Sequence, residues 1–254
     1  MLKVASLGSG SKGNSTLIAT EEATIMVDCG FTLKETLKRL ERLNVVPSAL
    51  DAILITHEHQ DHISGVGPLS RKFDIPVWST RGSLLSGKCG KLSNYSVIEG
   101  FNRFIIGDID VLPISVPHDA REPCQYLFNA DDKKLAVLTD LGSYTPEIIE
   151  LLKSCDGLLL ECNHDEDMLW NGPYPYSLKQ RVGGPLGHMS NSQAIKLLQS
   201  IIDDNLKLLI ASHISEQNNC PDLVQRSVAT AIDWPLGDVI IAEQDKGFDW
   251  LAVS

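Results

Sequence analysis

"ITHEHQDHISG", residues 55–65, holds three of the chain's seven histidines and an aspartate within six positions. The segment continues the apolar run "DAILIT", which is expected to form a buried strand. On the loop that leaves this strand, His57 and His59 would point two imidazoles to one side. The chain would then turn, so that Asp61 and His62 direct a carboxylate oxygen and an imidazole nitrogen toward a second position next to the first. Imidazole and carboxylate are ordinary ligands of zinc and other first-row metals, so the segment predicts a metal site at a strand end.

Two metal ions need more ligands than one loop supplies, and three further residues of the ligand type follow apolar runs elsewhere. His118 follows "VLPISVP", Asp140 ends "KLAVLTD", and His213 comes after "LKLLIAS". Each of them taken singly is also consistent with an ordinary polar residue or a turn. Their shared position at predicted strand ends favours the ligand interpretation for all three together.

The rest of the chain alternates strand-like and helix-like patterns. In the first half, strands are expected at 2–8, 15–20, 24–30 and 51–56, and a helix at 32–44. In the second half, strands are expected near 103–116, 125–130, 134–139, 157–162, 207–212 and 237–242, and helices near 145–153, 191–203 and 221–232. Tight turns such as "NADDKK" join neighbouring strands, which favours two sheets with outer helices over a run of parallel βαβ units. No linker or low-complexity tract divides the chain, so one domain is expected over residues 1–254.

Composition sets limits on location and partners. The net charge of −11 argues against electrostatic binding of nucleic acid over the whole surface. No stretch reaches the roughly 18 apolar residues of a membrane span, and the start of the chain lacks the apolar core of a signal peptide. We therefore expect a cytoplasmic protein without membrane association. The six cysteines are scattered singly, without a C-x-x-C pair, as expected of reduced core thiols.

The order of these motifs resembles that of the metallo-β-lactamase-fold hydrolases over nearly the whole chain. The resemblance implies an α/β fold, an αββα sandwich of two β-sheets flanked by helices, with two metals between the sheets. It also implies a supporting role for Asp28, in "MVDCG", without direct metal contact. Carried over residue by residue, the first metal would be held by His57, His59 and His118, the second by Asp61, His62 and His213, and Asp140 would bridge both.

The implied cofactor is a pair of divalent ions of zinc, manganese or iron. Two such ions roughly 3.5–4 Å apart lower the pKa of a shared water toward about 7 and clamp the oxygens of the substrate. The expected nucleophile is metal-bound hydroxide, and Asp61 would orient it or accept its proton as well as bind metal. The same kind of site serves β-lactams, thioesters, lactones and phosphodiesters, so the fold leaves the substrate open.

A second motif bears on the substrate. "GHMSNSQA" opens an amphipathic helix that Ser190 or Asn191 would cap, and His188 would stand at its positive end, a natural place for a phosphate oxygen. The placement resembles the tRNase Z type of nuclease, in which a histidine paired with an acidic residue at a strand end protonates the leaving oxygen. The resemblance implies catalytic roles for His188 and Glu161, although "ECNHD" replaces the family's "HEAT" pattern and a purely structural His188 stays open. His164 is either a metal or substrate contact or a hydrogen-bonded loop residue.

Four stretches beyond the ligands, "LGSGSKGNST", "ECNHDEDML", "GPYPYSLKQRV" and "GHMSNSQA", resemble the YycJ (WalJ, VicX) group of bacterial single-domain proteins. The resemblance implies a metal-dependent phosphodiesterase that acts on DNA as a 5′ to 3′ exonuclease. Two alternatives stay open: a thioester or lactone hydrolase on the same fold, and a regulatory partner without turnover. Trp170, Tyr174 and Tyr176 either stack on bases or pack the long loop that contains them.

Overall fold

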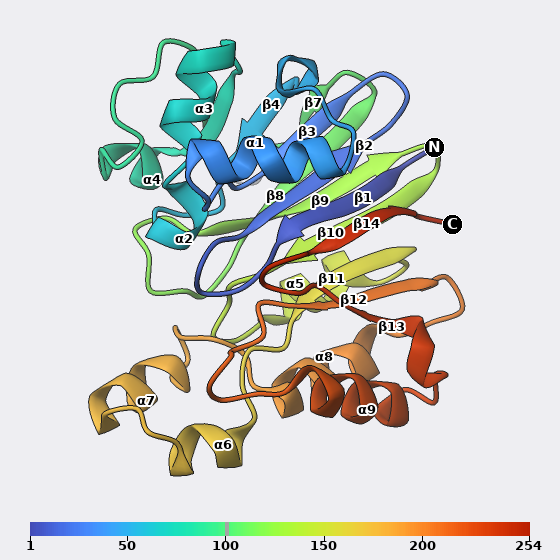
Figure 1. Ribbon diagram of the computed structural model, residues 1–254. Helices are drawn as coiled ribbons and strands as arrows, with labels where there is room; N and C mark the ends of the chain where they lie inside the picture. The colour runs from blue at the N-terminus through green and yellow to red at the C-terminus, as the bar shows by residue number, and fades with distance from the viewer. Residues whose placement is uncertain (100–101) are drawn as a thin grey trace.

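The computed structural model describes residues 1–99 and 102–254, in which two seven-stranded sheets pack face to face between layers of helices (Figure 1). The first sheet has the order β14 (Phe248–Ala252), β1 (Lys3–Gly8), β2 (Ser15–Ala19), β3 (Thr24–Val27), β4 (Ala52–Leu54), β5 (Val77–Thr80) and β6 (Tyr95–Ile98). The second has the order β13 (Val239–Ile241), β12 (Leu208–Ser212), β11 (Gly157–Glu161), β10 (Lys133–Leu138), β9 (Cys124–Ala130), β8 (Ile109–Ser115) and β7 (Phe104–Ile106). The predicted sandwich of two sheets flanked by helices is confirmed.

Helices cover the outer face of each sheet. The first sheet packs against α1 (Leu33–Arg42) and α3 (Val66–Phe73), and the second against α5 (Pro146–Leu152), α8 (Asn191–Ile201) and α9 (Pro221–Ala231). The remaining helices are α2 (Gln60–Ile63), α4 (Arg81–Leu85), α6 (Glu166–Asn171), α7 (Tyr176–Val182) and the 3₁₀ turns η1 (Pro47–Ala49) and η2 (Leu236–Asp238). No helix within residues 1–99 and 102–254 is long and apolar enough to cross a membrane.

The central strands are apolar on both faces because each sheet lies between two cores. In β12, Leu208 and Ile210 enter the core between the sheets, whereas Leu209 and Ala211 enter the core beneath α8 and α9. Successive residues of a strand point to opposite faces, so a strand buried on both sides appears in the sequence as an unbroken apolar run. Five of the six cysteines are buried, as expected, and Cys220 is exposed.

The start of α8 matches its sequence signature. Ser190 is the N-cap, its hydroxyl accepts from the Gln193 backbone N–H, and the Gln193 side chain accepts from the Ser190 N–H. This reciprocal pair is a capping box, which satisfies two backbone donors that the helix itself cannot pair. The helix is amphipathic, as predicted, and its inner face includes the buried residues Ala194, Leu197, Leu198 and Ile201.

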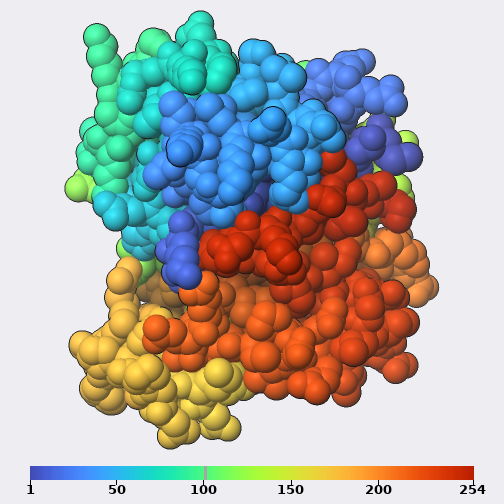
Figure 2. All heavy atoms as spheres, viewed as in Figure 1, coloured from blue at the N-terminus to red at the C-terminus, as the bar shows by residue number. Residues whose placement is uncertain are grey.

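Two stretches differ from their sequence expectation. The single strand expected near 103–116 is a hairpin, β7 and β8, whose turn has Gly107 at φ +59°, a left-handed conformation that glycine adopts readily. The segment after Asp165, expected to be irregular, contains α6 and α7. These helices bury little, Leu169 from α6 and no residue from α7, so they carry no clear amphipathic pattern. Figure 2 shows them as a lobe that projects from the body of the molecule.

Candidate metal centre

The histidine-rich loop leaves β4 and turns at once into α2. His57 lies on the loop, His59 is the N-cap residue of α2, and Asp61 and His62 lie within that helix. The loop packs closely against Gly30, where a Cβ atom would lie 1.7 Å from the carbonyl oxygen of Asp61. A residue without a side chain is therefore required beside the loop.

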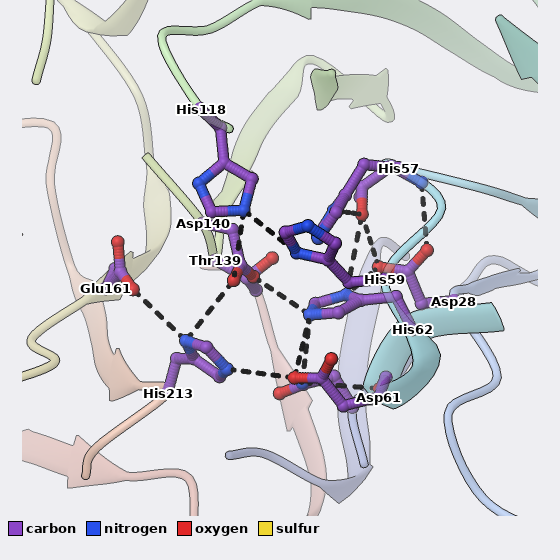
Figure 3. A network of polar contacts seen from close by, with 12 residues as sticks. Asp28, His57, His59, Asp61, His62, His118, Thr139, Asp140, Glu161 and His213 are labelled. Carbon is purple, nitrogen blue, oxygen red and sulfur yellow. Dashed lines mark hydrogen bonds and ion pairs between the residues drawn. The ribbon is translucent and has the colours of Figure 1, made fainter. Parts of the chain in front are cut away.

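The other three predicted ligands come from the second sheet. His118 follows β8, Asp140 follows β10 and His213 follows β12, and Figure 3 shows them directed toward the loop from the opposite side. Potential ligand atoms lie within 4.8 Å of one another in four groups: His57, His59 and His118; Asp61, His62 and His213; His57, His62 and Asp140; and Asp140, Glu161, His188 and His213. The structure thus brings all seven predicted residues into one cluster, called the ligand cluster below.

Asp140 lies between the histidines of the first two groups. Its Oδ2 is 3.1 Å from His62 Nε2, and its Oδ1 is 3.5 Å from His213 Nδ1 and 4.0 Å from His118 Nε2. The carboxylate is almost completely buried. Its two oxygens face different histidines, which suits a carboxylate shared by two cations.

Unpaired polar atoms test whether the cluster fits a metal. His57 Nε2 and His213 Nε2 are buried and have no hydrogen-bond partner among the described residues, and the buried Asp140 Oδ2 has only the ion-pair contact with His62 Nε2. A buried polar atom left unpaired costs roughly 1–3 kcal/mol, so two such nitrogens at one place need an explanation. Imidazole nitrogens and a carboxylate oxygen are donors of the kind that divalent transition metals accept, and the residues present fit such ions.

Asp28 supports the loop from behind. Its Oδ1 accepts from the Thr56 N–H at 2.8 Å, and its Oδ2 accepts from the Thr56 hydroxyl at 2.7 Å. The same Oδ2 lies 2.7 Å from His62 Nδ1, which leaves His62 Nε2 directed toward the ligand cluster. Asp28 has φ +59°, a left-handed conformation that is uncommon for a residue with a side chain. The carboxylate orients His62 in the way that outer partners commonly orient metal-binding histidines.

Two more histidines are oriented in the same way. His118 Nδ1 lies 3.0 Å from the carbonyl oxygen of Gly187, and His213 Nδ1 lies 3.1 Å from Glu161 Oε1. Their Nε2 atoms therefore remain available to the cluster. His213 also has a positive φ, +52°, at the point where the chain leaves β12.

Burial and charge set the protonation of the cluster. Burial and then the neighbouring His62 hold the pKa of His57 well below its usual range. Burial opposes protonation of His62 and His213 too, but the carboxylates, led by Asp140, outweigh it: the pKa of His62 is raised well above its usual range and that of His213 to about 10. Despite its burial, Asp140 has a pKa well below the usual range because of His213 and His62. Without metal the cluster therefore holds protons that a cation would displace.

Glu161, the last residue of β11, pairs with His188. Its Oε1 lies 2.7 Å from His188 Nδ1 and 3.1 Å from His213 Nδ1, while Oε2 accepts from the N–H groups of Leu141 and Met189. Burial lowers the pKa of His188, but the Glu161 carboxylate outweighs it and raises that pKa above its usual value. The two residues predicted as a catalytic pair are in contact. Their shared link to His213 was not predicted.

Two residues near the cluster were missed by sequence reasoning. The backbone N–H of Asn14 donates to the carbonyl oxygen of Asp61 at 2.7 Å, and its Nδ2 lies 3.1 Å from His62 Nε2. The glycine-rich stretch around Asn14 was the available signal, but it suggested no role. Asp119 directly follows a predicted ligand, and its Oδ1 lies 3.5 Å from His118 Nε2.

His164 stays outside the ligand cluster. It is buried, and it belongs to none of the groups of potential ligands found among the described residues. Its Nδ1 has no hydrogen-bond partner within residues 1–99 and 102–254. The structure therefore does not bring His164 into the ligand cluster.

The chain is similar to known proteins over most of its length. Residues 23–214 match the family described as Beta-lactamase superfamily domain. The chain is 35% identical over 237 residues to Exodeoxyribonuclease WalJ of Streptococcus pneumoniae serotype 2, with 91% of this chain and 88% of that protein covered. It is 34% identical over 233 residues to Exodeoxyribonuclease YycJ of Bacillus anthracis, with 89% and 88% covered. The crystal structure of the metallo-β-lactamase fold protein YhfI from Bacillus subtilis superposes on this chain with a TM-score of 0.78 and a sequence identity of 18%. The superposition covers 99% of this chain and 100% of that one, and it shows a shared fold alone.

Proposed function

The chain belongs to the β-lactamase superfamily, and from that premise we propose that it is a metal-dependent exodeoxyribonuclease that hydrolyses DNA in the 5′ to 3′ direction. Two relatives named exodeoxyribonucleases, 35% and 34% identical over most of the chain, support DNA as the substrate. The observation that carries the proposal is the contact between Glu161 and His188 beside the ligand cluster. Such a pair supplies a proton to a basic leaving oxygen, which phosphodiester hydrolysis needs. The proposal also implies that the protein acts in the cytoplasm, where its DNA substrate is available.

The ligand cluster would hold two ions. His57, His59 and His118 are assigned to one ion, Asp61, His62 and His213 to the other, and Asp140 to both. When bound, two divalent ions of zinc, manganese or iron would lower the pKa of a water and stabilise the charge on the phosphate oxygens. Asp28 and Glu161 would keep His62 and His213 in the orientation that presents Nε2.

Three side chains act on protons in this proposal. Glu161 accepts at His188 Nδ1 and favours the protonated ring, so Nε2–H of His188 is left to donate to the 3′-oxygen that departs. Asp61, whose side chain is 25% exposed, reaches the edge of the cluster where the substrate enters. Its carboxylate orients the attacking water or accepts its proton.

The test compares substrates on one preparation. Purified protein loaded separately with manganese, zinc or iron is given 5′-labelled single- and double-stranded DNA, a simple phosphodiester, a thioester and a lactone. We expect a labelled mononucleotide as the first product from DNA, because 5′ to 3′ cleavage releases the labelled end at once. Asp140→Ala is the inactive control. Faster turnover of the thioester or lactone than of any DNA would favour the small-molecule hydrolase, and no turnover of any substrate would favour a regulatory protein.

A further inference from the structure

The lobe formed by α6 and α7 carries two large aromatic side chains on its surface. Trp170 is 46% exposed and Tyr176 is 69% exposed. Their ring centroids lie 6.3 Å apart with an interplanar angle of 48°, so they form one continuous aromatic surface. Single exposed apolar side chains are common, but exposed ones that lie together often mark a binding surface. This aromatic pair, Trp170 and Tyr176, is therefore a candidate binding surface.

Hydrogen bonds fix the aromatic pair relative to the proposed acid. Lys179 Nζ donates to the carbonyl oxygen of Trp170 at 2.8 Å and so ties α7 to α6. The backbone N–H of His188 donates to the carbonyl oxygen of Val182, the last residue of α7, at 2.8 Å. Gly187 permits this close approach, because a Cβ atom there would lie 2.2 Å from the same carbonyl oxygen. The lobe and the catalytic histidine are parts of one hydrogen-bonded unit.

Arg181 joins the same helix to the ligand cluster. Its Nε donates to Asp119 Oδ2 at 2.5 Å, and Asp119 Oδ1 lies 3.5 Å from His118 Nε2. The Arg181 side chain is 58% exposed, which leaves much of the guanidinium open to solvent. Arg181 follows Tyr176 by five positions in α7, a rise of roughly 7.5 Å along the helix axis. Its ion pair with Asp119 thus places a cation of the lobe beside the ligand cluster.

We propose that Trp170 and Tyr176 stack on unpaired bases of a DNA strand next to the scissile phosphate, while Arg181 binds a backbone phosphate of the same strand. The inference rests on the proposed nuclease function and adds the state of the substrate, a single strand or a frayed end, because bases inside a duplex cannot stack on side chains. Lys179 and Arg181, in the last turn of α7, complement the charge of the phosphates. Every base has an aromatic face, so stacking suits an enzyme that accepts any sequence. It also supplies affinity to a chain whose net charge is −11.

The decisive variant is Tyr176→Ala, since the ring is the more exposed of the two. We expect the ratio of kcat/KM for a single-stranded oligonucleotide to kcat/KM for a nitrophenyl phosphodiester to fall roughly 5- to 100-fold, mainly through KM. Tyr176→Phe, which keeps the aromatic face, should restore the ratio. Trp170→Ala should also lower the ratio. Because the Trp170 ring lies against Gly183, the melting temperature of this variant must be measured to detect a loss of stability. The matched control is Tyr95→Ala, an exposed tyrosine on β6 with 55% exposure, which should leave the ratio at the wild-type level.

The outcomes separate this inference from the proposed function. If the wild-type protein degrades DNA and Tyr176→Ala leaves the KM for oligonucleotides unchanged, the stacking inference is wrong and the nuclease function stands. If the wild-type protein degrades no DNA, the proposed function fails, and the inference fails with it. A change from oligomer to monomer in light scattering on Tyr176→Ala, with unchanged KM, would identify the aromatic pair as a contact between copies of the chain and overturn the inference.

Discussion

Glu161 Oε1 lies 2.7 Å from His188 Nδ1, and the carboxylate that makes this contact is fully buried. The other oxygen of Glu161 is held by two backbone N–H groups, so the side chain has no freedom to turn away. Because Oε1 also contacts His213, one carboxylate links the proposed proton donor to the ligand cluster.

His188→Ala should lower DNA hydrolysis by about 10²- to 10⁴-fold, because a departing 3′-alkoxide needs a proton. Hydrolysis of a nitrophenyl phosphodiester, whose leaving group needs none, should be reduced much less. Metal content measured by elemental analysis should stay at the wild-type level. Equal losses on both substrates would instead assign His188 a structural role.

Glu161→Gln should move the alkaline limb of the pH–rate profile on DNA to lower pH. The carboxylate raises the pKa of His188, so the wild-type ring keeps its proton to higher pH and activity falls only as the pH passes that raised value. Without the Glu161 charge, the His188 ring loses its proton at a lower pH. The measurement is kcat against pH with metal content checked in parallel, because Glu161 also orients His213. An unmoved limb would mean that another group titrates.

Asp140→Ala should cause a larger loss of bound metal than removal of any one histidine of the cluster, because its carboxylate faces His118 of one group and His62 and His213 of the other. The wild-type chain should bind about two ions after reconstitution. Asp110→Ala serves as the control, since this aspartate pairs with Arg103 away from the site. No more than a trace of metal in the wild-type protein, after loading with zinc, manganese or iron, would refute the dinuclear interpretation.

Metal binding near pH 7 should release roughly two protons per chain, from His62 and His213, whose pKa values the carboxylates raise in the ion-free protein. His57 should release none, since burial already keeps its ring neutral. Calorimetric titration with zinc in buffers of different ionisation enthalpy measures this number. Affinity should weaken as the pH falls, because protons compete for the same nitrogens. A heat that does not depend on the buffer would contradict the assignment.

Much of the fold could be predicted because its strands are buried on both faces. In "LKLLIAS", for example, the strand residues before Ser212 are all apolar. Both the strand and the position of His213 at its end could therefore be predicted. The capped helix α8 was equally clear, because its cap and its buried face agree. In these segments the local sequence pattern agrees with the secondary structure and burial observed in the folded chain.

The parts that could not be predicted depend on contacts between distant segments. Asn14 reaches Asp61 and His62 from the first loop of the chain, and no spacing in the sequence indicates that approach. The helices α6 and α7 are six and seven residues long and bury almost nothing, so they leave no periodic signal. The ion pair between Arg181 and Asp119 likewise exists only because the lobe folds back over the strand end before Asp119.

The ligand cluster draws its members from both sheets, with His57 and His62 from the loop and helix α2 that follow β4, and Asp140 and His213 from the ends of β10 and β12. A bound ion would thus be a reversible cross-link between parts of the chain that are far apart in sequence. Ligands that bind only the native state stabilise it by mass action. Removal of metal with a chelator should therefore lower the melting temperature as well as abolish activity, and a cell poor in metal would hold a looser, more protease-sensitive protein.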